Sequence, residues 1–142
     1  MTARWKDGSK GMLTVNALFA GFSGALAINL AIRKWDDYST EMFALLLAVA
    51  ALYFFALAAE WITDALDEGD VDRYLRSMIV YNVGVVLVLL SIALLLWSQS
   101  HRVLAVIAAL LSIRPWLTHA AWFMTASGAE KDAYRAKLLT EE

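Results

Sequence analysis

Residues 75–98 read LRSMIVYNVGVVLVLLSIALLLWS. This stretch contains one charged residue, Arg76, and exceeds the roughly 20 apolar residues that a helix needs to cross the hydrocarbon core of a bilayer. Its leucine, isoleucine and valine residues follow one another without the alternation that is typical of a barrel strand. The stretch therefore predicts a membrane-spanning helix.

Three other stretches have the same character. With the first, they give four predicted spans, at about 12–33, 41–64, 75–98 and 102–126. The connections between them are short, which makes consecutive helices antiparallel neighbours. The sequence predicts an all-α polytopic membrane protein, a bundle of four transmembrane helices. Residues 1–142 form a single membrane domain with short cytoplasmic tails.

The composition supports this fold and excludes several functions. Hydrophobic residues make up 61% of the chain and charged residues 18%, with a formal net charge of −2. An ordinary soluble domain is only about half apolar. The charge balance does not favour nucleic acid as a partner, and the absence of cysteine excludes disulfides, thiolate catalysis and cysteine metal sites.

The distribution of lysine and arginine predicts the orientation. Three basic residues belong to the side of the first and third connections: Arg33, Lys34 and Arg102. Eight belong to the side of the two termini and the second connection: Arg4, Lys6, Lys10, Arg73, Arg76, Lys131, Arg135 and Lys137. By the positive-inside rule both termini are cytoplasmic. The expected location is the plasma membrane, as a bacterial inner-membrane protein.

The first predicted helix is rich in small residues, with Ala17, Gly21 and Ala25 four residues apart. Such spacing lets helix backbones approach closely in lipid, so we expect this helix to be central and tightly packed. One stripe of the helix is polar at its ends and apolar in its middle. Its members are Lys6, Lys10, Thr14, Leu18, Phe22, Ala25, Asn29 and Arg33.

Two interpretations of this stripe remain open. It is either the surface of a buried helix with ordinary interfacial ends, or the lining of a pore formed by several copies of the chain. In the second case Leu18 and Phe22 form a hydrophobic constriction, since such constrictions gate by dewetting. Asn29 and Arg33 then form the outer mouth, and the two lysines form the inner mouth.

Polar residues also lie inside the other predicted spans: Tyr53, Glu60, Asn82, Arg114 and His119. A charge near the bilayer centre costs about 2.5–3.5 kcal/mol, so these groups are expected to face the bundle interior and pair with one another. Such a network either braces the bundle or lines a path for ions or protons. The one proline, Pro115, is expected to kink the fourth helix beside Arg114.

The acidic second connection, TDALDEGDVDRY, lacks the spacing and closing glutamate of a calcium loop. We interpret it as a solvated turn, with Asp72 in the first turn of the third helix. One glutamate and one histidine do not make a metal site. The sequence also lacks a nucleophile motif. We therefore expect neither a metal, nor another cofactor, nor enzymatic activity.

The stretch ALFAGFSGALAINL at residues 17–30 resembles the first helix of the Orai calcium channel family. Lys6 and Lys10 upstream and Pro115 in the fourth helix are similar to features of that family. The resemblance implies a four-helix subunit whose first helix lines a multi-subunit pore. However, Asn29 occupies the position of the family's selectivity glutamate, Thr14 replaces a basic pore residue, and the third helix has no acidic residue inside the membrane.

Taken together, these observations predict a homo-oligomeric ion channel with the first helix around the axis. Its basic rings favour anion or poorly selective passage over calcium. The expected partners are the bilayer, further copies of the chain and the permeating ion. Two alternatives remain: a membrane scaffold or regulatory subunit that acts on a partner protein, and a proton-coupled transporter that uses Glu60 and His119.

Overall fold

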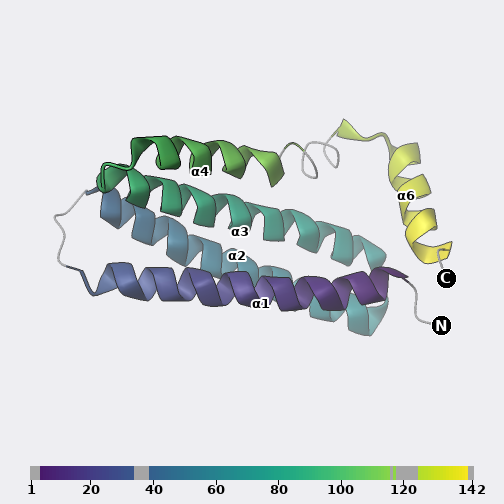
Figure 1. Ribbon diagram of the computed structural model, residues 1–142. Coiled ribbons are helices and arrows are strands. Elements are labelled where there is room, and N and C mark those ends of the chain that lie inside the picture. Colours follow the sequence, from purple (N-terminus) through teal and green to yellow (C-terminus); the bar gives the residue numbers. More distant parts are fainter. Residues whose placement is uncertain (1–3, 34–38, 116, 118–124, 141–142) are drawn as a thin grey trace.

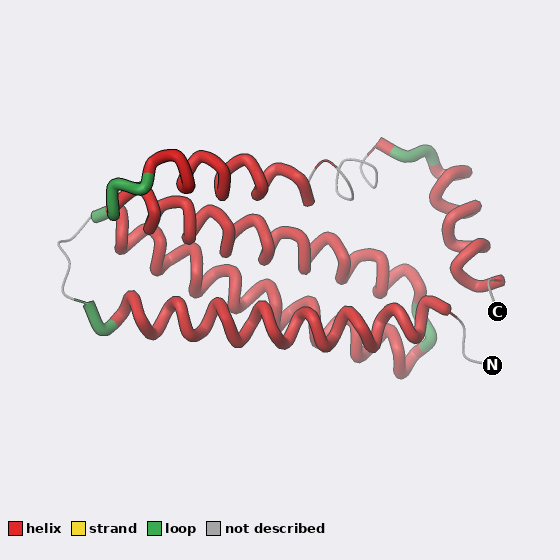
Figure 2. Tube along the Cα trace, viewed as in Figure 1, coloured by secondary structure: helices red, strands yellow, loops and turns green. Residues whose placement is uncertain are grey.

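The computed structural model describes residues 4–33, 39–115, 117 and 125–140. These residues form helices and no strands, as Figures 1 and 2 show. The helices are α1 (Arg4–Ala31), α2 (Thr40–Glu68), α3 (Val71–Ser98), α4 (Arg102–Pro115) and α6 (Gly128–Thr140). The predicted all-α fold is therefore confirmed.

Three helices are long and apolar enough to cross a membrane: Lys6–Ala31 within α1, then α2 and α3. They confirm the predicted spans 12–33, 41–64 and 75–98, and each extends further at the end that holds the α2–α3 turn. The described helix α4 has 14 residues. The remainder of the predicted span 102–126 includes residues 116 and 118–124, which lie outside the described residues.

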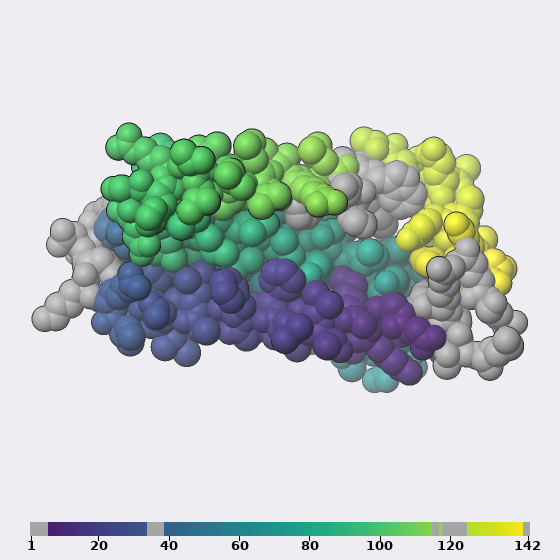
Figure 3. Space-filling model, viewed as in Figure 1, coloured from purple at the N-terminus to yellow at the C-terminus, as the bar shows by residue number. Residues whose placement is uncertain are grey.

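The long helices pack one against the next. Helix α2 contacts both α1 and α3, and α3 also contacts α4, whereas contacts between α1 and α3 are few. Figure 3 shows the side chains of α3 between those of α4 and those of α1. The described helices thus form a series of neighbours, and the predicted bundle of four transmembrane helices is not confirmed.

Helix α2 is the central helix of this series. Its buried residues recur at heptad spacing: Ala44, Ala48, Ala51, Phe55, Ala58, Ile62 and Ala65. Most are alanine, which lets neighbouring backbones approach closely. The prediction of a central first helix is wrong, because α1 lies at the edge of the series. Its small residues Ala17, Gly21 and Ala25 are exposed, so this chain does not use them for its own packing.

Helix α1 binds α2 through a buried line of mostly polar residues seven apart: Ser9, Asn16, Ser23 and Leu30. The Asn16 Nδ2 donates to the Phe55 carbonyl at 2.6 Å, and the Ser23 Oγ donates to the Ala48 carbonyl at 2.9 Å. Hydroxyl and amide groups in lipid need such partners, because no water is available to them. The two hydrogen bonds therefore fix the register of α1 on α2.

Helix α3 packs closely on α2 where Gly84 meets Phe55. A Cβ atom added to Gly84 would lie 2.8 Å from the Phe55 ring, so a larger residue requires the ring or the backbones to shift. Further along, the Ser91 Oγ donates to the Ala44 carbonyl at 2.6 Å. Close backbone approach and a hydrogen bond to a carbonyl are the means by which membrane helices associate.

The turn between α2 and α3 is short and well defined. Gly69 adopts the left-handed conformation, with φ of 69°, and ends α2, while the Asp70 carboxylate accepts from the backbone N–H groups of Asp72 and Arg73 and begins α3. Asp72 lies in the first turn of α3, as predicted. The start of α1, this turn and α6 all lie at the same end of the helices (Figure 1).

Candidate functional site

The predicted stripe of α1 lies on the face of that helix that points away from α2. Its central residues Leu18 and Phe22 are 69% and 51% exposed. Thr14, Ala25, Asn29 and Arg33 are exposed as well, and so is Lys10, whereas Lys6 is half-buried. From Lys10 to Arg33 the stripe is therefore a continuous exposed surface, and within the described residues nothing covers this part of it.

This surface is polar at its two ends. The Thr14 hydroxyl donates to the Lys10 carbonyl of its own helix at 3.3 Å. The carboxamide of Asn29 is exposed towards the other end, one turn before Arg33. Beside the stripe, a Cβ atom added to Gly21 would meet nothing within 4 Å. Another helix could therefore approach this part of α1 closely.

The predicted intramembrane polar network is not assembled within the part of the chain that the structure describes. Tyr53 and Glu60 are exposed on the face of α2 opposite its buried residues, and Arg114 is exposed on α4. Asn82 is half-buried on α3, and His119 lies outside the described residues. No hydrogen bond or ion pair joins Tyr53, Glu60 or Asn82 to Arg114. These groups lie at similar depths along their helices, but the structure does not bring them together.

The segment around Arg114 also differs from expectation. The Ser112 Oγ donates to the Ala109 carbonyl of its own helix at 2.6 Å. Helix α4 ends at Pro115. The predicted kink needs a helix that continues past the proline, and residues 116 and 118–124 are not described.

A groove of about 300 Å³ runs between α1 and α3. Its lining is mainly apolar: Met12, Val15, Tyr74, Met78, Tyr81 and Asn82. Asn82 contributes the one carboxamide. Among the described residues this side chain makes no hydrogen bond. The groove therefore combines an apolar surface with one polar group that has no hydrogen-bond partner among the described residues.

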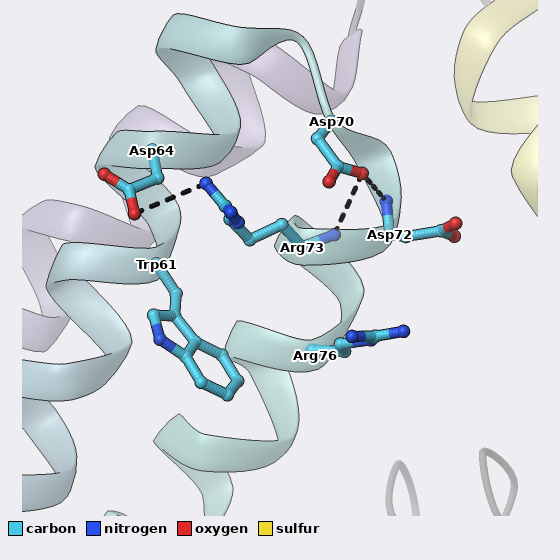
Figure 4. A pocket seen from close by; sticks show the side chains of 6 residues that line it. All are labelled: Trp61, Asp64, Asp70, Asp72, Arg73 and Arg76. Carbon is cyan, nitrogen blue, oxygen red and sulfur yellow. Dashed lines mark hydrogen bonds and ion pairs between the residues drawn. The ribbon is translucent and has the colours of Figure 1, made fainter.

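Charged side chains gather where α2 meets α3, around a cavity of about 370 Å³ (Figure 4). Arg73 forms ion pairs with Glu68 at 2.9 Å and with Asp64 at 3.4 Å. Figure 4 shows Arg73 extending towards Asp64, while Asp72 and Arg76 point to the opposite side. Most charges here neutralise one another, and within the described residues no group of three acidic or histidine side chains is placed to hold a metal ion.

Helix α6 binds to this charged end through an ion pair and an apolar contact. The Arg135 Nε donates to the Asp72 carboxylate at 2.9 Å, and this carboxylate raises the pKa of the guanidinium. Leu138 packs against the apolar cluster around Tyr74 and Leu75. The sequence interpretation had treated this segment as a short tail and missed both the helix and the ion pair.

The sequence does contain one signature that predicts helix α6, a capping box at the start of the helix. The Ser127 N–H and Oγ donate to the Glu130 carboxylate at 2.7 and 2.8 Å, while the Glu130 N–H donates to the Ser127 Oγ at 3.3 Å. The backbone hydrogen bond from Ser127, followed by that from its hydroxyl, lowers the pKa of Glu130. Serine followed three residues later by glutamate is a recognised sequence signature of a helix start.

Three long apolar helices, whose polar side chains bond to backbone carbonyls of a neighbouring helix, define an integral membrane protein. Comparisons of the chain with models of known families, with characterised proteins and with solved structures give no match. The resemblance of residues 17–30 to the Orai-type channels stays a prediction.

Proposed function

We propose that this chain is one subunit of a homo-oligomeric ion channel whose pore is lined by the exposed stripe of α1. One observation carries the proposal: from Lys10 to Arg33 the stripe is exposed and faces away from α2. A face that carries lysine, asparagine and arginine suits water better than hydrocarbon. Copies of α1 around an axis would give these side chains an aqueous surface.

The charges of the stripe favour anions. Its ionisable members are Lys6, Lys10 and Arg33, so every charged ring of such a pore would be basic. Rings of lysine and arginine select for anions, whereas cation channels use aspartate or glutamate rings. We therefore propose anion or poorly selective passage, in a plasma membrane and with both termini in the cytoplasm.

Ion flux into proteoliposomes tests the proposal. Wild-type protein is expected to conduct chloride, and Leu18→Ser or Phe22→Ser should raise the flux severalfold by wetting the constriction. Ile28→Ser is the matched control, since Ile28 is a large exposed residue of the same helix off the stripe. Equal effects of the three variants would contradict a pore lined by this stripe.

The mass of the purified protein in detergent separates this function from its alternatives. An oligomer that conducts ions supports the channel. A monomer that co-purifies with another protein and carries no flux supports a scaffold or regulatory subunit instead. A proton-coupled transporter would need Glu60 and His119 together. Glu60 lies on the outward face of α2, which does not favour that alternative.

A further inference from the structure

Tyr53 projects from the outer face of α2. Its side chain is 64% exposed, and its ring packs edge-on against Phe54, with the centroids 5.8 Å apart. Its hydroxyl forms no hydrogen bond to any described residue. Tyr53 lies about 20 Å from the outer end of α2, where a bilayer offers no water to a hydroxyl group.

The groove between α1 and α3 is concave, whereas Tyr53 projects. Its lining is apolar with one polar group, which suits the ring and the hydroxyl of a tyrosine. It is at the small end of protein pockets, which suits one large side chain better than a separate organic ligand. Asn82 lines it and, like Tyr53, has no hydrogen-bond partner in the described chain. A lipid acyl chain could fill the apolar part of the groove but could not bond to the carboxamide.

Tyr53 and Asn82 lie at the same level of the molecule. The hydrogen bond from Ser91 to the Ala44 carbonyl aligns the antiparallel helices α2 and α3. Tyr53 follows Ala44 by nine residues, and Asn82 precedes Ser91 by nine residues. Because both helices rise by the same distance per residue, the two side chains share one depth. Rotation about an axis along the membrane normal preserves that depth in every copy.

We propose that Tyr53 of one copy inserts into the α1–α3 groove of the next copy, where its hydroxyl hydrogen-bonds to Asn82. The projecting side chain and the groove belong to different faces, since Tyr53 points away from the α1 and α3 contacts of α2. The contact is therefore heterologous, and a heterologous contact builds a ring when its rotation closes. This inference rests on the proposed channel and names the contact that would assemble it.

Cross-linking in native membranes with a short bifunctional thiol reagent tests the contact, because the chain contains no cysteine of its own. A direct disulfide would be too short, since it needs Cα atoms within about 7 Å and an inserted tyrosine holds them further apart. Two differently tagged full-length chains are co-expressed, one with Tyr53→Cys and the other with Asn82→Cys. The reagent should yield a cross-linked dimer that carries both tags. Neither variant alone should cross-link, since a heterologous contact does not place a residue beside its own equivalent.

Leu46→Cys paired with Asn82→Cys is the matched control. Leu46 is exposed on the same face of α2, one heptad and about 10 Å from Tyr53 along the helix. This pair should give no product. An oligomer by mass with no product between positions 53 and 82, or with a product from one variant alone, would overturn the contact and leave the channel proposal intact. A monomer throughout would overturn both.

The hydrogen bond has its own test. Tyr53→Phe keeps the ring and removes the hydroxyl, and Asn82→Leu keeps the volume of the side chain and removes the carboxamide. Each should weaken self-association about threefold, which is the average effect of a hydrogen bond between membrane helices. The double variant should be no weaker than either single variant, because both remove the same bond. Additive losses would contradict a bond between these two groups.

Discussion

Gly84→Ala should destabilise the protein, although alanine is the better helix former. The Cβ atom of the alanine would lie 2.8 Å from Cε1 and 2.9 Å from Cδ1 of Phe55. Favourable contacts between carbon atoms lie at about 3.5–4.0 Å, so the new atom is about 0.7–1.2 Å too close. Either the Phe55 ring or the α2 and α3 backbones must move to accept it.

The ring has little freedom to move. Phe55 is fully buried, and the rings of Phe19 and Tyr81 lie against it, each with its centroid 5.7 Å away. Overpacking of a well-filled core costs about 1–3 kcal/mol. The higher helix propensity of alanine than of glycine offsets at most about 1 kcal/mol of this cost. With that full offset subtracted, we expect a net loss of up to about 2 kcal/mol in the free energy of unfolding.

Denaturant titration of the protein in mixed micelles, followed by circular dichroism, measures this loss. Gly11→Ala is the control, since Gly11 is an exposed helical glycine and an added Cβ would meet nothing within 4 Å. That variant should gain up to about 1 kcal/mol. If Gly84→Ala were as stable as Gly11→Ala, close packing of α2 on α3 would not depend on this glycine, and the reasoning would be refuted.

Three other predictions follow from single contacts. Arg135→Gln removes the ion pair with Asp72, so amide exchange in α6 should quicken roughly two- to fivefold while α2 and α3 stay protected. Because the capping box lowers the pKa of Glu130 below 4.5, its stabilisation of α6 is complete above pH 4.5 and is lost as the pH falls through the lowered folded-state value. Glu130→Gln should abolish this dependence of the α6 amide signals on pH. Ser91→Ala loses a hydrogen bond between helices and should cost about 1 kcal/mol in unfolding free energy. Ser98→Ala loses a bond to its own helix and should cost less in the same titration.

The existence of the three long helices could be predicted because hydropathy reports the part of a helix that lies in hydrocarbon. Their ends could not be predicted from hydropathy, since α1 begins at Arg4 and α2 continues to Glu68, among polar residues. Capping residues mark those ends better, as Gly69 and Asp70 do between α2 and α3. For the same reason α6, which is polar, could be found only from its capping box.

The candidate site could be predicted only within one helix at a time. Helical spacing places Leu18 and Phe22 on one stripe of α1, and the structure confirms that they share an exposed face. Spacing does not tell how a helix is rotated against its neighbours. Tyr53, Asn82 and Arg114 have similar depths in their helices, which suggested a network, yet they lie on three different surfaces. The depth of a residue in the membrane is fixed by its position along the helix. The surface on which its side chain lies depends on how that helix packs against its neighbours.

Three asparagines in apolar segments show how packing decides the role of a polar group. Asn16 is 1% exposed and donates to the Phe55 carbonyl, so it serves the fold of its own chain. Ser23 and Ser91 likewise donate to carbonyls of α2, which meets its neighbours through small apolar side chains. The polar groups that α1, α2 and α3 leave at the surface are then those that these contacts between helices do not use. Exposed Asn29, half-buried Asn82 and the hydroxyl of Tyr53 belong to this second set. In a bilayer they can be satisfied only by water in a pore or by another protein surface.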